Sequence, residues 1–335
     1  MISVRGVARA AVVGAMVLLA AGAVQAVVID TVPVGNPGNA ADNTGYGAVA
    51  YSFNMGKYEV TAGQYTAFLN AVGGLDTYAL YNTNMSNTSS GSGITQSGGG
   101  TGGNPYTYSV ATDFANRPLN YVGWGDAARF ANWLHNGQPT GGQVLSTTED
   151  GAYYLNGATS NAALLAVSRE VDWKWAITSE DEWYKAAYYN PATGTYFDYP
   201  TSSNTAPGRD MADVSGNNVN YTGGSGTYPI DSGKYTTLAG EFQNSDSPYG
   251  TFDQGGNIEE WTEAVIGSTR GQRGGSFSSG YDGPRASYRS IDFPGGPTAE
   301  YDGLGFRVSE VPEPATLSLL ALGVAAVMAR RQKKN

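Results

Sequence analysis

The segment Asp253-Gln-Gly-Gly-Asn-Ile-Glu-Glu-Trp261, followed by Arg273-Gly-Gly-Ser276, contains the residues that decide the fold. It lies in a part of the chain, residues 188–306, where Gly, Pro, Asn and Asp recur every few residues and no helical apolar stripe survives. This punctuation predicts short strands joined by long ordered loops. Buried loops need partners for their backbone groups, and specific turns or bound ions supply them.

Two helices are predicted earlier in the chain. Thr61 and Gln64 form a capping box, after which apolar residues recur with helical spacing over 62–72. A second apolar stripe covers 124–134 and ends near Asn136-Gly137, where a left-handed cap costs little.

A third helix is predicted to start at Ser179, which has an acid three residues later. Glu180, Asp181 and Glu182 then occupy the first turn, where negative charge favours the helix dipole. We therefore assign these carboxylates a structural role rather than general acid–base catalysis.

The stretch 82–104 consists almost entirely of Gly, Ser, Thr and Asn. Such a composition buries too little apolar surface to order itself, so we interpret it as a flexible insertion.

Both ends of the chain carry transport features. Arg5 and Arg9 precede an apolar run that ends at Val24-Gln-Ala26, which is typical of a secretory signal peptide cleaved near Val27. At the other end, Val311-Pro-Glu-Pro314 is followed by an uncharged run over 315–329 and then by a basic cluster. A helix over that run would be about 22 Å long, short for a hydrocarbon core of about 30 Å.

The order of these C-terminal parts resembles the PEP-CTERM sorting signal of Gram-negative bacteria. The resemblance implies a short transmembrane helix held in the inner membrane and processing by an exosortase-type protease. The protein would then reach the cell surface, outer envelope or extracellular matrix, often in cells that make exopolysaccharide. An ordinary tail anchor is the alternative interpretation.

Composition restricts the partners. The chain has 335 residues, 19 basic and 29 acidic, and no cysteine. Without the two terminal segments, 13 basic and 28 acidic residues remain, a net charge of about −15. Phosphate backbones would repel such a protein, which makes nucleic acid an unsuitable partner. Disulfides and thiol chemistry are excluded as well.

Six landmarks occur in order along residues 51–308. They are MGKYEVT at 55–61, RPLNYV at 117–122 with Trp124 and Asp126-Ala127, SEDEW at 179–183, GNIEEW at 256–261, RGGS at 273–276 and GFR at 305–307. In this order they resemble the formylglycine-generating enzyme family, also called the sulfatase-modifying factor family. The resemblance implies an α+β fold: a single domain related to the C-type lectin fold, with low regular secondary structure.

The chain is thus divided into a signal peptide (1–26), a lead-in (27–50), the family domain (51–309) and the sorting signal (311–335).

The chemistry of the family does not follow from the resemblance. Its sulfatase-activating members oxidise a substrate cysteine with a cysteine pair and copper, and here Ser279 stands at the first of those positions. A serine hydroxyl is neither a copper(I) ligand of that kind nor a redox group. Iron-binding relatives use several histidines, whereas this chain has only His135, which we interpret as a surface residue.

A structural calcium site does follow from the resemblance. Its ligands would be the side chains of Asp253 and Glu260 and the carbonyls of Gly256 and Ile258. Calcium binds six to eight hard oxygens, which a Gly-rich loop can supply. The alternative is that Asn257 and Glu260 only hold a turn. Glu259 replaces the usual aromatic and would either strengthen binding or face water.

The second calcium site of the family matches only in its first half, at Asn220 and the carbonyl of Tyr221. We expect it not to be fully occupied.

Arginines near the C-terminal end of the domain either grip an anionic ligand or stitch loops together. For Arg273 and Arg307 we expect the structural role, because bidentate Arg–carboxylate bridges suit irregular packing.

Two functions remain open at this stage. The first is a non-catalytic surface or matrix protein that binds exopolysaccharide or an envelope protein. The second is an enzyme with divergent, cysteine-independent chemistry. Because no activated Ser, Tyr or carboxylate pair can be recognised, the sequence favours the first; a passive spacer is a third possibility.

Overall fold

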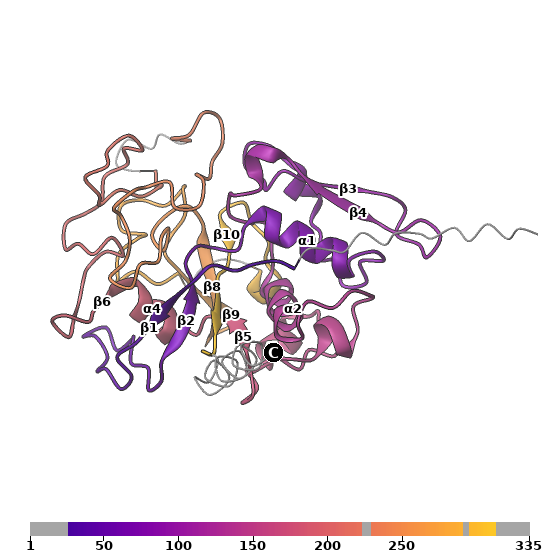
Figure 1. Ribbon diagram of the computed structural model, residues 1–335, viewed down its shortest axis with the longest axis horizontal. Helices are drawn as coiled ribbons and strands as arrows, with labels where there is room; N and C mark the ends of the chain where they lie inside the picture. Colours follow the sequence, from indigo (N-terminus) through magenta and orange to yellow (C-terminus); the bar gives the residue numbers. More distant parts are fainter. Residues whose placement is uncertain (1–25, 223–228, 291–294, 313–335) are drawn as a thin grey trace, which may run out of the picture.

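A computed structural model describes residues 26–222, 229–290 and 295–312 (Figure 1). The signal peptide prediction, apart from Ala26, and the C-terminal helix prediction lie outside these residues. Within them, no helix combines the length and apolar character needed to cross a bilayer.

Short helices and strands alternate with long loops, as the sequence predicts. The helices are α1 (Ala62–Val72), α2 (Trp124–His135), α3 (Asn161–Leu165) and α4 (Glu180–Tyr188), with single-turn elements η1 (Thr83–Ser86), η2 (Thr112–Phe114), η3 (Leu145–Glu149) and η4 (Gly296–Thr298). The strands are β1 (Thr31–Val34), β2 (Phe53–Gly56), β3 (Ile94–Ser97), β4 (Thr107–Val110), β5 (Trp175–Ile177), β6 (Tyr189–Asn190), β7 (Thr195–Tyr196), β8 (Glu259–Ile266), β9 (Thr269–Arg273), β10 (Leu304–Gly305) and β11 (Val308–Glu310).

One sheet joins both ends of the domain. Its order is β1-β2-β11-β5, with antiparallel neighbours, so the last strand lies between strands from the beginning and the middle of the chain. A second sheet has the order β10-β8-β9. Figure 1 shows α4 to the left of these central strands and α1 and α2 to their right.

The three predicted helices are confirmed. Thr61 caps α1, since its hydroxyl accepts the N–H of Gln64 and the Gln64 side chain accepts the N–H of Thr61. Helix α4 starts with the same arrangement between Ser179 and Glu182. Helix α2 ends before Gly137, whose φ of 79° is the left-handed conformation expected there.

Helix α2 differs from the prediction of a single apolar stripe. All residues from Trp124 to Leu134 are buried, because loops cover the face that the pattern assigned to solvent. The polar residues on that face are satisfied inside the domain. Arg129 forms a bidentate ion pair with Glu149, and Asn132 bonds the backbone of Tyr153.

The stretch 82–104 also differs from our expectation of a flexible insertion. It contains η1 and β3, and β3 pairs with β4 in an antiparallel hairpin. Met85 and Ile94 have 0% exposed surface, so two apolar side chains suffice to dock the polar stretch on the core.

Aromatic packing holds the landmark Phe306 against the helices. Its ring centroid lies 5.5 Å from that of Phe130 in α2, which in turn lies 5.4 Å from that of Phe68 in α1. Both contacts are edge-to-face, the geometry that aromatic pairs prefer.

Phe306→Ala should lower the free energy of unfolding by about 3–5 kcal/mol, because it leaves a cavity between α2 and the second sheet. Urea unfolding followed by tryptophan fluorescence measures this loss. Val265→Ala, at a side chain that is 53% exposed, should change it by less than about 0.5 kcal/mol. A similar small effect of both substitutions would contradict the packing role of Phe306.

Candidate functional site

An ion pair between Arg307 and Glu260 lies buried inside the domain, with 0% of either side chain exposed. Arg307 Nη2 donates to Glu260 Oε1 and Arg307 Nε donates to Glu260 Oε2, each at 2.6 Å. Trp183 Nε1 donates to the same Oε2 at 2.8 Å. Burial alone would lower the pKa of Arg307, but the charge and hydrogen bonds of Glu260, with the charges of Glu59 and Asp253, together outweigh burial and raise it. Arg307 therefore stays charged.

The same guanidinium also binds two stretches of backbone. Arg307 Nη1 donates to the carbonyl of Gly56 and Nη2 to the carbonyl of Phe252, both at 3.0 Å. Strand β2, the loop before Asp253, strand β8 and helix α4 thus meet at this ion pair, which α4 reaches through the bond from Trp183 to Glu260.

The structure brings the predicted calcium positions onto one loop beside this pair. Asp253 is buried, with its Oδ2 accepting the N–H of Gly240 at 2.6 Å. Gly256 has a φ of 75°, and a Cβ there would lie 2.2 Å from the carbonyl oxygen of Asn220, so the loop requires glycine. Ile258 is buried as well.

Glu260, one of the predicted calcium ligands, accepts hydrogen bonds from Arg307 through both carboxylate oxygens. An ionised carboxylate has about four acceptor sites, so this pairing does not by itself exclude a metal. Calcium at Asp253, Glu260 and the carbonyls of Gly256 and Ile258 stays a prediction.

Further acids crowd the same region. Glu59 is buried, its Oε1 lies 3.3 Å from the donor Asn257 Nδ2, and Oε2 has no partner within the described residues. Burial, and then the negative charges of Asp253 and Glu260, raise the pKa of Glu59 well above its usual range. Burial also raises the pKa of Asp253 to about 6.

Glu259 does not face water, which was one of our two expectations for it. It is 3% exposed, and among the described residues its Oε1 has no hydrogen-bond partner. Burial raises the pKa of Glu259 to about 8, although a hydrogen bond with Ser290 opposes the shift. The family's usual residue at this position is aromatic, and in this chain a carboxyl group occupies the buried position instead.

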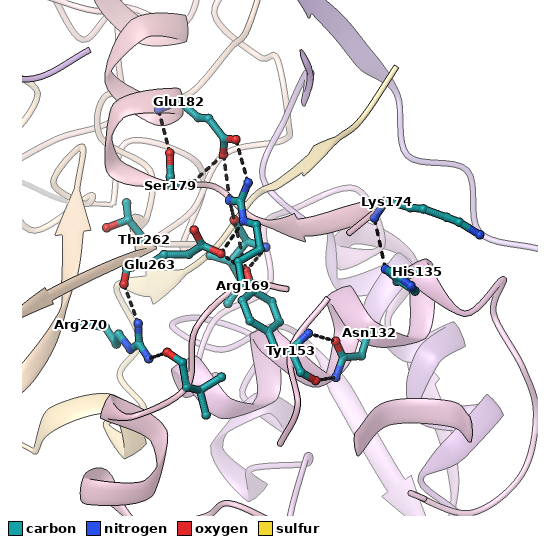
Figure 2. A network of polar contacts seen from close by, with 12 residues as sticks. Asn132, His135, Tyr153, Arg169, Lys174, Ser179, Glu182, Thr262, Glu263 and Arg270 are labelled. Carbon is teal, nitrogen blue, oxygen red and sulfur yellow. Dashed lines mark hydrogen bonds and ion pairs between the residues drawn. The ribbon is translucent and has the colours of Figure 1, made fainter. Parts of the chain in front are cut away.

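Ser279, at the first position of the family's cysteine pair, has a structural role. Its Oγ accepts the backbone N–H of Ser276 at 2.9 Å, and its own N–H donates to the Ser276 carbonyl. A serine nucleophile needs a base within hydrogen-bond reach, and no such base bonds Ser279 Oγ in the described part of the chain. His135, at the far end of α2, instead accepts the N–H of Lys174 (Figure 2).

The turn that follows Ser279 presents polar and aromatic groups to solvent. Tyr281 is 55% exposed, and the side chains of Asp282 and Arg285 are 55% and 44% exposed. These residues are suited to bind a ligand at the surface, since an exposed ring stacks and the charged groups donate or accept hydrogen bonds.

The structural role expected for Arg273 is confirmed. Arg273 Nε donates to Glu180 Oε1 at 2.8 Å, and Arg289 Nη2 donates to Glu180 Oε2 at 2.5 Å. Glu180 therefore ties the start of α4 to the end of β9 and to the loop beyond it, which agrees with the structural role predicted for the acids of this helix.

A second buried network escaped the sequence analysis (Figure 2). Arg169 donates to Glu263 through Nε at 2.7 Å and to Glu182 through Nη1 at 2.8 Å, and Tyr153 donates to Glu263. Arg169 lies 94 positions before Glu263. No local spacing signals a pair so far apart, and charged residues near Arg169 in the sequence, such as Glu170 and Asp172, give no hint of its actual partners.

Asn220, from the half-matched second calcium site, is also buried. Its Nδ2 donates to the carbonyl of Tyr235 at 2.8 Å, while Oδ1 has no partner among the described residues. The loop predicted to lack the second half of that site is 222–226, and residues 223–226 lie outside the description.

Comparisons with known proteins identify the family of the domain and the motif at its C-terminal side. The family model described as "Sulfatase-modifying factor enzyme 1-like domain" matches residues 6–311. The model described as "PEP-CTERM protein-sorting motif" matches residues 310–334. A search of curated proteins finds no match.

Two solved structures resemble the fold. Variable protein 1 of Treponema denticola has 18% identity and a TM-score of 0.52, covering 86% of this chain and 97% of that protein. The crystal structure of CarF also has 18% identity and a TM-score of 0.52, covering 85% of this chain and 99% of CarF. At this identity the likeness shows the fold alone, a mixture of helices and strands.

Glu260→Gln should lower the free energy of unfolding by about 3–5 kcal/mol, because it leaves Arg307 buried without its counter-ion. We expect the loss to persist in a chelator, since the ion pair accounts for it without a metal. Thermal melts of both proteins in both buffers measure this. A chelator effect on the wild type that the substitution removes would establish Glu260 as a calcium ligand as well.

Glu259→Gln should stabilise the protein at pH 8 and leave it nearly unchanged at pH 5. A carboxyl whose folded pKa is raised from 4.5 to about 8 weakens folding progressively as the pH rises through that interval, because the unfolded chain ionises first. The amide cannot ionise, so the expected gain at pH 8 is a few kcal/mol.

Melting curves between pH 5 and 8 test this, with Asp172→Asn, at an exposed acid, as the control. If the melting temperatures of the wild type and of Glu259→Gln change with pH in the same way, Glu259 does not ionise as a buried carboxyl in this range.

Proposed function

The chain belongs to the sulfatase-modifying factor enzyme 1-like family, and we propose that it is an exported, surface-sorted member that binds a ligand without catalysis. The domain would act as a binding or matrix component of the cell envelope, in the manner of a lectin. The observation that carries the proposal is the hydrogen bond from the backbone N–H of Ser276 to Ser279 Oγ. It gives Ser279 a structural role in a turn, at the position of the family's catalytic pair.

The sorting motif supports export to the envelope. Residues 310–334 match a PEP-CTERM motif, which implies processing by an exosortase-type protease. We propose that a signal peptide directs export and that a short C-terminal helix anchors the protein transiently in the inner membrane of a Gram-negative bacterium. Cleavage would then release the domain to the surface or to an exopolysaccharide matrix.

The residues themselves argue against the family's chemistry. No cysteine occurs in the chain, so neither a thiolate copper site nor a thiol redox step is possible. A cysteine-independent enzyme would need an activated nucleophile, and Ser279 lacks a bonded base in the described residues. The nearby acids Glu180 and Glu260 are held by arginines, which leaves them unsuited to proton transfer.

The exposed turn after Ser279 supports a binding role. It places Tyr281 on the surface beside the exposed ion pair of Arg285 and Asp282, so that a ligand there would meet a ring face and charged hydrogen-bonding groups. Polysaccharide is the ligand class we propose, because sugar rings stack on aromatic faces. Calcium bound by Asp253, Glu260 and the carbonyls of Gly256 and Ile258 would act only as a structural clip.

Tyr281→Ala should weaken retention of the full-length chain, kept in mild detergent, on extracellular polysaccharide from the same organism. Losing one stacking ring should reduce the affinity about fivefold, or about 1 kcal/mol. Cosedimentation with the polysaccharide measures the bound fraction. Tyr154→Ala removes a ring that is 52% exposed elsewhere on the domain and should have no effect.

Equal losses in the two variants would show that the turn is not the binding surface. If the wild type is retained on no glycan but captures one discrete envelope protein, the ligand is a protein and the polysaccharide proposal falls.

A further inference from the structure

A cavity of about 310 Å³ opens at the start of helix α2, away from the ion pair of Arg307. It lies among Gly123, the N-cap of α2, Asp126 and Arg129 within α2, the segment 77–79, and the residues around η4, which include Glu300. This volume is at the lower end of the range for small-molecule sites, about 300–1,000 Å³.

Two carboxylates line the cavity, and neither has a counter-ion. Asp126 is 7% exposed; its Oδ2 accepts the N–H of Gly123 at 2.9 Å, while Oδ1 receives no hydrogen bond from the described residues. Glu300 uses Oε2 to accept from Asn82 Nδ2. Neither acid forms an ion pair with any described residue.

The cation in the cavity wall is already neutralised. Arg129 donates to Glu149 through Nε at 2.7 Å and through Nη2 at 3.0 Å, and Nη2 also donates to the carbonyl of Ala158. Its guanidinium lies 4.3 Å from the ring centroid of Tyr78. Arg129 therefore contributes little positive charge to the cavity.

A third acid adds to the negative potential. Asp76 accepts only neutral donors, from the backbone of Leu80 and Tyr81 and from Gln143. Burial, and then the charge of Glu300, raises the pKa of Asp126 well above its usual range. Burial also raises the pKa of Glu300, and the charge of Asp76 adds to this shift. The charge of Arg129 lowers the pKa of Asp126 but does not offset these causes, so burial and the neighbouring carboxylates dominate.

The negative charge of the lining acids and the volume of the cavity together limit the class of ligand that fits. No group of three or more His, Cys, Asp or Glu side chains suited to a metal ion occurs in the described residues, so we consider an organic cation here. An ammonium group has three donors, and Asp126 Oδ1 and Glu300 Oε1 can accept two of them, since neither oxygen accepts a hydrogen bond from the described residues. At the rim, the exposed residues Thr77 and Thr159 offer hydroxyls whose hydrogen bonds within the described chain are unfilled.

We infer that this cavity binds a small organic cation, a protonated primary amine that also carries hydroxyl groups, of about the size of an amino sugar. Asp126 and Glu300 hold the ammonium group, and the threonines at the rim bond the hydroxyls. This inference rests on the binding role proposed above and gives it a ligand class, at a site separate from the turn of Tyr281.

Calorimetric titration of the full-length chain in mild detergent tests the inference, with glucosamine as the probe and glucose as its uncharged match. Glucosamine should bind at least about tenfold more tightly than glucose, because only its ammonium forms charge-assisted hydrogen bonds with the acids. Asp126→Asn and Glu300→Gln should each weaken glucosamine binding about tenfold or more.

Both substitutions keep an oxygen that can accept the existing hydrogen bonds, from Gly123 and from Asn82, while removing the charge. Asp172→Asn, at an exposed acid outside the cavity, is the matched control and should leave binding unchanged. If Asp126→Asn does not fold, Glu300→Gln carries the test, since Glu300 is the less buried of the two.

Equal binding of glucose and glucosamine, no binding of glucosamine, or an equal loss in Asp172→Asn would each overturn the inference. Such a result would leave the proposed function intact if Tyr281-dependent retention on polysaccharide persists. The two proposals therefore fail separately.

Discussion

The buried pair of Arg307 and Glu260 is the constraint on which the rest of the domain depends. Two charges without solvent are tolerated only when each has a partner and the remaining hydrogen bonds are filled. Here the carboxylate of Glu260 accepts hydrogen bonds from Arg307 and Trp183. The guanidinium of Arg307 also donates to the carbonyls of Gly56 and Phe252. Little regular structure is needed, because one ion pair joins β2, α4, the stretch 252–260 and the segment of Arg307.

Further ion pairs between arginine and glutamate join helices to loops and strands elsewhere in the domain. Glu180 holds Arg273 and Arg289, Arg169 holds Glu182 and Glu263, and Arg129 holds Glu149. A chain without disulfides thus obtains its cross-links from buried arginines. Carboxylates left over from this pairing, such as Glu59, Glu259 and Asp126, have raised pKa values, since burial opposes their ionisation. Such unpaired buried acids mark positions where burial destabilises the charged form and where a bound cation would be favoured.

How far the site could be read from the sequence depended on the distance between partners. Capping pairs such as Thr61 with Gln64 are three residues apart, and both their existence and their geometry were predicted. The structural role of Arg307 was expected, but its partner was not: the resemblance assigned Glu260 to calcium instead. The order in 82–104 was missed because composition averages over the stretch and hides the effect of Met85 and Ile94.

By itself, the sequence determined the helix starts, the family, the sorting motif and the loss of cysteine chemistry. These follow from local spacing, or from the presence or absence of a residue type. Only the tertiary structure decided which cation meets Glu260, that Glu259 is buried, and that Asp126 and Glu300 share a cavity. The physical reason is that burial and Coulomb energy depend on distance in space, and residues 174 positions apart carry no mark of their proximity in a single sequence.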